Sequence, residues 1–173
     1  MPPLQKEDRR GGMIDEGLKA RAEKSASQMI DWIGRHDSRS AGLMGITVAM
    51  MGALSAATPS FKQWDALFIF VLSLCAAGFG MVLYQLMRGQ IPRLRMGKPS
   101  LFFFGTVAGM PQEEFRARFM AMTEEEYIED LLSQCYVNSR ILRSKFRCLK
   151  RGLMTLLITA IPWTWALSLA KSL

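Results

Sequence analysis

The stretch ALFIFVLSLCAAGFGMVLYQL, residues 66–86, carries no charged side chain. A helix needs about 20 apolar residues to cross a bilayer, so this stretch is predicted to be a transmembrane helix. Tyr84 near its end is an amphipathic side chain typical of a membrane interface. Residues 41–57 and 152–170 are also uncharged and apolar, and we predict two more spans there. A soluble core helix is the alternative for residues 152–170, but it is disfavoured because no face of that stretch is charged.

The bulk composition agrees with a membrane protein. The chain has 173 residues, half of them hydrophobic, yet its net charge is +7 and its sequence pI is about 9.7. Apolar and charged residues fall into separate blocks, as they do in small membrane proteins with a cytoplasmic part. The densest basic runs adjoin apolar stretches, so we expect the excess charge to meet anionic lipid headgroups rather than a nucleic acid polymer.

The distribution of Lys and Arg predicts the topology. These residues collect before the first span, after the second and before the third. By the positive-inside rule, the N-terminus is cytoplasmic and the C-terminus lies outside. The predicted fold is therefore all-α, an integral membrane protein with three transmembrane helices and a small cytoplasmic helical module.

The remaining segments are assigned from local patterns. Residues 1–13, rich in Pro, Gly and charge, are predicted to be a disordered tail. Residues 14–40 are predicted to be a cytoplasmic amphipathic helix, and residues 87–151 a cytoplasmic loop with helices. The helix has a narrow apolar stripe at helical spacing that packs either on its own domain or on a neighbouring subunit. The stripe comprises Ile14, Leu18, Ala22, Ala26, Met29 and Ile33.

A long helix is predicted to begin at Thr123. Thr123 and Glu126 have the spacing of a capping box, in which each side chain accepts from the other residue's backbone N–H. Residues 140–151 then hold six basic side chains and no acid. Pro162 interrupts the third span and is expected to kink it.

Small residues recur along the first span at spacings of three and four. They are Gly42, Gly45, Ala49, Gly52 and Ala56. Small residues on one face allow two helices to approach closely in lipid. The partner is either the next span of the same chain or another subunit, and the sequence leaves both open. The second span has its own pair, Ala76 and Gly80.

Catalytic and metal-binding motifs are missing from the sequence. It has no Walker A, GxSxG, HExxH or dinucleotide fingerprint, so we predict that the protein is not an enzyme. The one histidine, His36, is interpreted as structural or solvated. Cys75, Cys135 and Cys148 are widely spaced without a CxxC motif, which argues against both a disulfide framework and a zinc site.

One polar face of the long helix is a candidate binding site. Gln134, Asn138 and Lys145 share this face, and Arg140 lies beside it. Amides can read the edge of a base, and a cation can pair with a phosphate, so a small anionic heterocycle would suit these residues. Spacing alone favours a plainer interpretation, in which the amides cap helix contacts and the basic residues hold lipid.

Three stretches, in this order, resemble the transmembrane Pycsar effector family. They are DSRSAGL at residues 37–43, SLFFFGTVAGMPQEEF at residues 100–115 and YIEDLLSQCYVNSRILRSKFRCLKRGL at residues 127–153. The first is similar to the family's Asp-x-Lys-Ala-type start of the first span, with Arg39 in place of Lys and Ser40 before Ala41. The resemblance covers most of the chain beyond about Ile14.

This resemblance implies an antiphage function. It implies an effector without catalytic activity or a cofactor, which responds to cUMP or cCMP from a partner cyclase. The response impairs the bacterial inner membrane and causes abortive infection. A homo-oligomer is expected. The rival interpretation is a membrane scaffold or accessory subunit that binds a protein partner.

The resemblance also bears on the candidate binding residues. It favours ligand binding by Gln134, Asn138 and Lys145. Known cyclic-nucleotide-binding β-barrels do not fit in this chain, so the pocket would be helical. The SLFFFG segment, residues 100–105, is similar to the family's Phe-Gly element. We expect one or two of its rings to pack on the long helix, and another, Phe103, to stack on a base.

Overall fold

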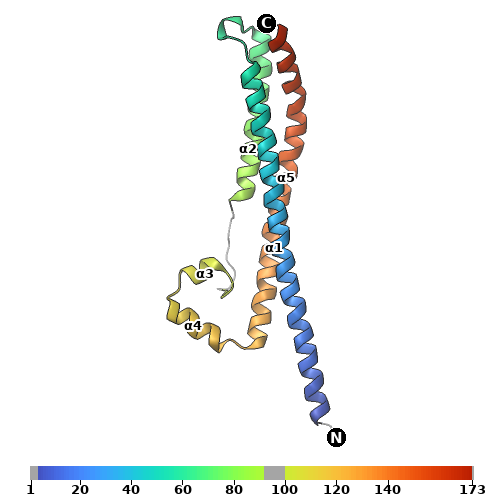
Figure 1. Cartoon of the computed structure of the whole chain (residues 1–173), viewed down its shortest axis with the longest axis vertical. Helices are drawn as coiled ribbons and strands as arrows, with labels where there is room; N and C mark the ends of the chain where they lie inside the picture. The colour runs from blue at the N-terminus through green and yellow to red at the C-terminus, as the bar shows by residue number, and fades with distance from the viewer. Residues whose placement is uncertain (1–3, 92–99, 173) are drawn as a thin grey trace. The chain divides into compact units, whose positions relative to one another are not determined.

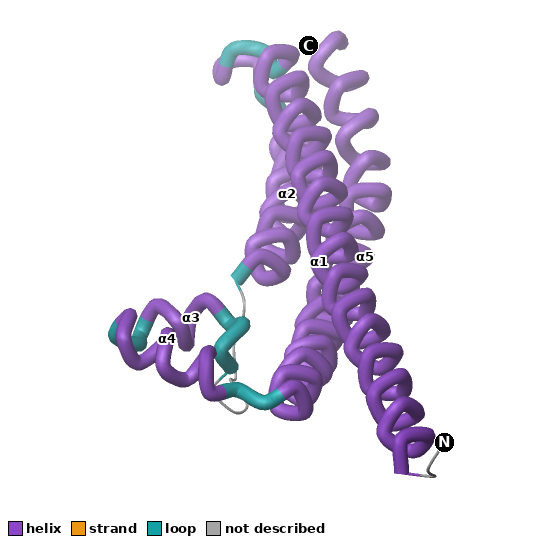
Figure 2. The backbone as a smooth tube through the Cα atoms, turned by 60° about the horizontal axis from the view of Figure 1, so that its bottom comes forward, coloured by secondary structure: helices purple, strands orange, loops and turns teal. Residues whose placement is uncertain are grey.

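The computed structural model describes residues 4–91 and 100–172, with side chains from Glu16 onward. Most residues in these ranges are helical and none forms a strand, which confirms the all-α prediction (Figures 1 and 2). The elements are α1 (Leu4–Ala57), the 3₁₀ turn η1 (Phe61–Gln63), α2 (Ala66–Gln90), α3 (Phe104–Ala108), α4 (Gln112–Ala121) and α5 (Glu124–Ser172). Arg93, Arg95, Lys98 and Pro99, part of the predicted basic loop, lie outside the described residues.

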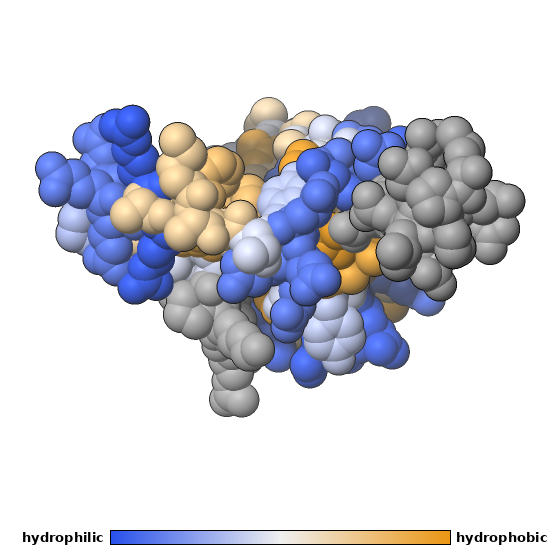
Figure 3. All heavy atoms as spheres, turned by 90° about the horizontal axis from the view of Figure 1, so that it is seen from below, coloured by the Kyte–Doolittle hydropathy of each residue, from blue (hydrophilic) through white to orange (hydrophobic). Residues whose placement is uncertain are grey.

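The helices form two compact units. The first, here called the helical unit, combines Met1–Ile33 with Arg93–Leu142. The second, the span unit, combines Gly34–Pro92 with Arg143–Leu173. Hydrophilic side chains cover much of the face seen from the end where α1 begins (Figure 3).

Helix α1 is longer than the sequence patterns suggested. It begins at Leu4, so residues 4–13 are helical where their composition predicts a disordered tail. It also continues without a break from the predicted amphipathic helix into the first span. No proline occurs between Leu4 and Ala57, and a glycine within a helix costs only about 1 kcal/mol. Pro59 then disfavours a helical conformation at Thr58, and α1 ends one residue earlier, at Ala57.

Three helices are long and apolar enough to cross a membrane. The described segments with this property are Glu16–Ala57, Ala66–Gln90 and Glu124–Ser172, which contain the three predicted spans. In the span unit, the parts of α1, α2 and α5 that belong to it lie side by side (Figure 1).

Helix α2 supplies most of the core of the span unit. The Asp65 side chain caps it by accepting a hydrogen bond from the Phe68 backbone N–H at 2.7 Å. Its buried apolar residues recur every three or four positions, so they form one face. They are Phe68, Val71, Cys75, Phe79, Val82 and Leu86. Leu43 and Leu54 from α1 and Leu156 and Ala166 from α5 complete the cluster around this face.

Small residues let α2 and α5 approach closely. A Cβ atom added at Gly78 would collide with the Thr159 side chain, and one at Gly89 would lie 3.2 Å from the Cβ of Cys148. Ala76 and Gly80, the small pair noted in the sequence, are instead exposed, and nothing lies within 4 Å of a Cβ added at Gly80.

Helix α5 begins with the predicted capping box. The Thr123 N–H donates to Glu126 Oε2 at 2.9 Å, and the Glu126 N–H donates to Thr123 Oγ1 at 3.3 Å. The helix extends through Pro162 to Ser172. Beside the proline, the Trp163 indole N–H donates to the backbone oxygen of Met50 at 2.9 Å and so connects α5 to α1.

Candidate functional site

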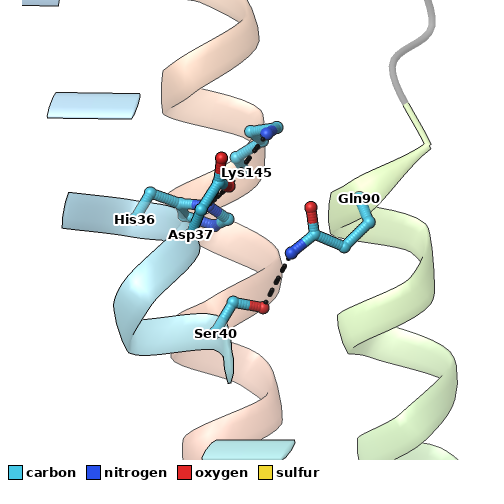
Figure 4. Close-up of polar contacts among 5 residues, drawn as sticks. All are labelled: His36, Asp37, Ser40, Gln90 and Lys145. Carbon is cyan, nitrogen blue, oxygen red and sulfur yellow. Dashed lines mark hydrogen bonds and ion pairs between the residues drawn. The ribbon is translucent and has the colours of Figure 1, made fainter. Parts of the chain in front are cut away.

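A group of polar side chains joins all three helices of the span unit just before the first apolar stretch (Figure 4). We call it the pre-span cluster. Helix α1 contributes His36, Asp37 and Ser40, α2 contributes Gln90, and α5 contributes Lys145.

One oxygen of Asp37 holds two partners in this cluster. Its Oδ1 lies 3.0 Å from His36 Nδ1 and 3.2 Å from the Lys145 ammonium. The Lys145 side chain is only 15% exposed, whereas that of Asp37 is 47% exposed. The hydrogen bond from His36, and then the one from Lys145, lower the pKa of Asp37 below its ordinary value of 3.8. The carboxylate is therefore kept charged at a place that solvent can reach.

His36 fixes the geometry of this pair. Its ring is buried, and its edge meets Phe146 of α5 with the ring centroids 5.2 Å apart. An edge-to-face contact of this kind is favourable and directional. The sequence context of His36 predicts a structural or solvated histidine, and the burial of the ring agrees with a structural one.

Ser40 ties the same part of α1 to α2. Its side chain is buried, and its Oγ accepts a hydrogen bond from Gln90 Nε2 at 3.1 Å. About one turn of α1 therefore contacts α5 through Asp37 and α2 through Ser40. A change in any of these contacts would alter how the start of the first span packs on α2 and α5.

The helical unit contains a second polar contact, which holds the phenylalanine segment. Asp130 Oδ2 on α5 accepts from Ser100 Oγ at 2.9 Å and from the Leu101 N–H at 3.1 Å. Ser100 is buried, and its Oγ accepts from the Phe102 N–H at 3.0 Å. The segment is therefore fixed to α5 through its backbone as well as its side chains.

The three phenylalanines have different surroundings. The Phe102 ring packs against Tyr127 of α5, with centroids 5.3 Å apart, which confirms that one ring packs on the long helix. Phe103 packs against Phe104, at 4.8 Å. Phe104 itself is 75% exposed. The structure thus leaves one ring of the segment largely open, and this is Phe104 rather than Phe103.

Further contacts in the helical unit join α1 to α5. Ala22, with Ala26 beside it, packs on Ile128 and Leu131. The predicted apolar stripe therefore meets its own domain at these positions, although Leu18 remains 40% exposed. The Tyr127 hydroxyl donates to Glu23 at 3.0 Å, and Lys19 pairs with Glu124 at 2.9 Å. Burial, and then the bond to Glu23, raise the pKa of Tyr127.

The predicted nucleotide-binding residues of α5 belong to both compact units. Gln134 and Asn138 belong to the helical unit and are half-buried, and their amides make no hydrogen bond to any described residue. Arg140 lies over the Tyr136 ring, 6.0 Å from its centroid. Lys145 belongs to the span unit, where Asp37 binds it. The amides are thus available for a ligand, while the ammonium already has an anionic partner.

The small residues of the first span are exposed. A Cβ atom added at Gly42, Gly45 or Gly52 would meet no atom within 4 Å, and Ala49 and Ala56 are also exposed. Contact with another span of the same chain, one of the two alternatives, is therefore not made by this stripe. Cys75, Cys135 and Cys148 are buried free thiols, in agreement with the absence of a predicted disulfide.

Sequence reasoning missed three members of the two polar contacts. Asp130 and Gln90 were not singled out from the sequence, and Ser40 appeared only within the DSRSAGL stretch. Position 37 was noted only through the resemblance of DSRSAGL to a family motif. A search for polar residues flanking every predicted span would have found Ser40, Gln90 and Lys145 together.

These observations define a three-span helical membrane protein with a polar cluster at the start of its first span. The sequence model of the Pycsar effector protein domain matches residues 21–171. The chain therefore belongs to the Pycsar effector protein family. It is also similar to the Pycsar effector protein GmPycTM of Gulbenkiania mobilis, with 30% identity over 66 residues, or 38% of this chain. The aligned part is 34% of that relative's length. No solved structure matches the chain.

Proposed function

We propose that this protein is a membrane effector of an antiphage defence system. A partner pyrimidine cyclase makes cUMP or cCMP on infection, and the nucleotide activates the effector. The activated protein impairs the bacterial inner membrane and causes abortive infection. The observation that carries this proposal is the match to the Pycsar effector domain over residues 21–171, a range that includes all three apolar stretches.

The proposed ligand contacts come from the residues with suitable chemistry. Gln134 and Asn138 offer amide donors and acceptors that no described residue uses, and a pyrimidine edge needs both. Lys145 offers a charge for the cyclic phosphate, and Arg140 a second cation. Phe103, which is half-buried and packs against Phe104, would offer its ring for stacking. The protein acts through binding and not through catalysis.

We further propose that activation involves several copies of the chain. The exposed small-residue face of the first span suits close contact with the same face of another copy in lipid. The N-terminus is cytoplasmic, so the ligand would reach the helical unit from the cytoplasm. A scaffold that binds a protein partner, the rival function, would need no response to a nucleotide.

The test compares the wild type with the double variant Asn138→Ala and Lys145→Ala. We expect the variant to insert normally and to ignore the nucleotide, because alanine is well tolerated in a helix. Losing a charged hydrogen bond and a base contact costs roughly 2.5–4 kcal/mol, on the order of 10²-fold in affinity. Cells receive external cUMP or cCMP, and a dye that enters only damaged cells reports membrane integrity. A normal response by the variant would show that the nucleotide is sensed elsewhere, and no response by the wild type would contradict the function.

A further inference from the structure

Asp37 forms an ion pair with Lys145, the residue that the proposed function assigns to the ligand phosphate. Its Oδ1 lies 3.2 Å from the Lys145 ammonium. No other carboxylate in residues 16–91 or 100–172 lies within 4 Å of that ammonium. A carboxylate and a phosphate oxygen are both charged acceptors for a lysine, so they compete for the same donor.

Resting on the proposed function, we infer that Asp37 is an internal competitor of the nucleotide for Lys145. In the free protein the Asp37 carboxylate pairs with the ammonium and lowers the affinity for the ligand. When the cyclic phosphate binds Lys145, Asp37 loses this partner. The contact is therefore autoinhibitory, and its loss releases an ionic connection between α1 and α5 just before the first span.

The geometry of the cluster suits such an exchange. Asp37 is about half exposed, so its released carboxylate can be solvated. It also keeps a second partner, because His36 Nδ1 lies 3.0 Å from the same oxygen and is itself held against Phe146. Release of Lys145 thus leaves Asp37 with a hydrogen bond and a hydration shell. A fully buried carboxylate would pay a far larger cost on losing its cation.

Calorimetry of the detergent-purified full chain with cUMP and with cCMP tests this inference. We expect Asp37→Asn to bind the active nucleotide more tightly than the wild type, by up to about fivefold, which is the upper end for removing a partly exposed competing ion pair. Asp37→Ala, which removes the acceptor altogether, should change affinity in the same direction. Lys145→Met should weaken binding by at least about tenfold.

Asp65→Asn is the matched control. It removes the same charge and weakens a helix cap, but Asp65 lies at the other end of α2 from Gln90. Its affinity should equal that of the wild type. If the wild type binds and the Asp37 variants bind equally or more weakly, the competitor inference is wrong and the proposed function stands. If Asp65→Asn tightens nucleotide binding as much as Asp37→Asn does, the change in net charge explains both results and the competitor inference is wrong. If the wild type binds neither nucleotide, the proposed function fails and the inference with it.

Discussion

At the scale of single residues, the chain combines weak exchangeable contacts with rigid ones. Asp37 shares one oxygen between His36 and Lys145, and such partly exposed ion pairs typically contribute only up to about 1 kcal/mol. Gly78, by contrast, lies where no side chain fits, because Thr159 occupies the space beside it. The Asp37 ion pair can lose its charge or exchange partners, whereas the close contact at Gly78 has no alternative arrangement.

The pH dependence of stability should report on Asp37. Because the folded state lowers the pKa of this carboxyl below 3.8, its contribution to stability is present above that value. It is lost as the pH falls through the lower folded-state pKa. We expect the wild type to be more stable than Asp37→Asn by at most about 1 kcal/mol near neutral pH, with the difference vanishing in acid. Unfolding in detergent from about pH 6 down to about pH 2 measures this. A difference that persists in acid would assign the effect to packing.

Adding one methyl group at Gly78 should destabilise the span unit. The Cβ atom of Gly78→Ala would overlap the Thr159 side chain, and overpacking of this kind costs roughly 1–3 kcal/mol. Gly80→Ala is the matched control, since nothing lies near its added methyl group. Thermal unfolding in detergent should therefore show a lower Tm for the first variant than for the second. Equal Tm values would mean that α2 and α5 separate easily.

At the scale of elements, the phenylalanine segment depends on α5. Its backbone is held by Asp130 and Ser100, and its Phe102 ring by Tyr127. Within the segment itself, Ser100 accepts from the Phe102 and Phe103 N–H groups, and the contacts to Asp130 and Tyr127 come from α5. The conformation of the segment therefore depends on its contacts with α5.

Removing Asp130 should release this segment. Asp130→Ala deletes two hydrogen bonds to a charged acceptor, each worth roughly 1.5–3 kcal/mol. The Leu101 and Phe102 amides should then exchange with deuterium at least about tenfold faster than in the wild type. Hydrogen exchange followed by mass spectrometry measures this on residues 100–105. Glu125→Ala, in the first turn of α5, is the control, and equal protection in both variants would contradict this role of Asp130.

Local sequence signals predicted elements well and contacts between them poorly. Thr123 and Glu126 form the predicted capping box because both partners lie within one turn. Residues 66–86 form a span because their composition alone requires it. The Asp37–Lys145 pair joins residues 108 positions apart, and no local pattern encodes such a pairing. The start of α1 at Leu4 was not predicted, because the Pro, Gly and charge content of residues 1–13 indicated a disordered tail.

At the scale of the whole molecule, the exposed small-residue face governs the expected assembly. Gly45→Leu and Gly52→Leu should each weaken self-association, because a leucine side chain keeps two helices apart in lipid. Met51→Phe is the matched control, since it adds bulk at an exposed position of α1 that has no stripe residue three or four positions away. Cross-linking in native membranes measures the oligomer, and dye entry measures the damage. If both glycine variants form oligomers and damage membranes normally, the stripe is dispensable.

The contrast between Gly78 and the pre-span cluster bears on which helix can move. Helices α2 and α5 interlock at Gly78 and Gly89, so sliding one past the other would force side chains into backbone. Polar contacts join α1 to them at Asp37, Ser40 and Met50, and α1 adds only two residues, Leu43 and Leu54, to the buried core. Moving α1 by one turn, about 5.4 Å, would break the contact to Lys145, because Ile33 or Ala41 would then take the place of Asp37. If a helix of the span unit changes register, α1 is therefore expected to slide along its own axis while α2 and α5 stay fixed against each other.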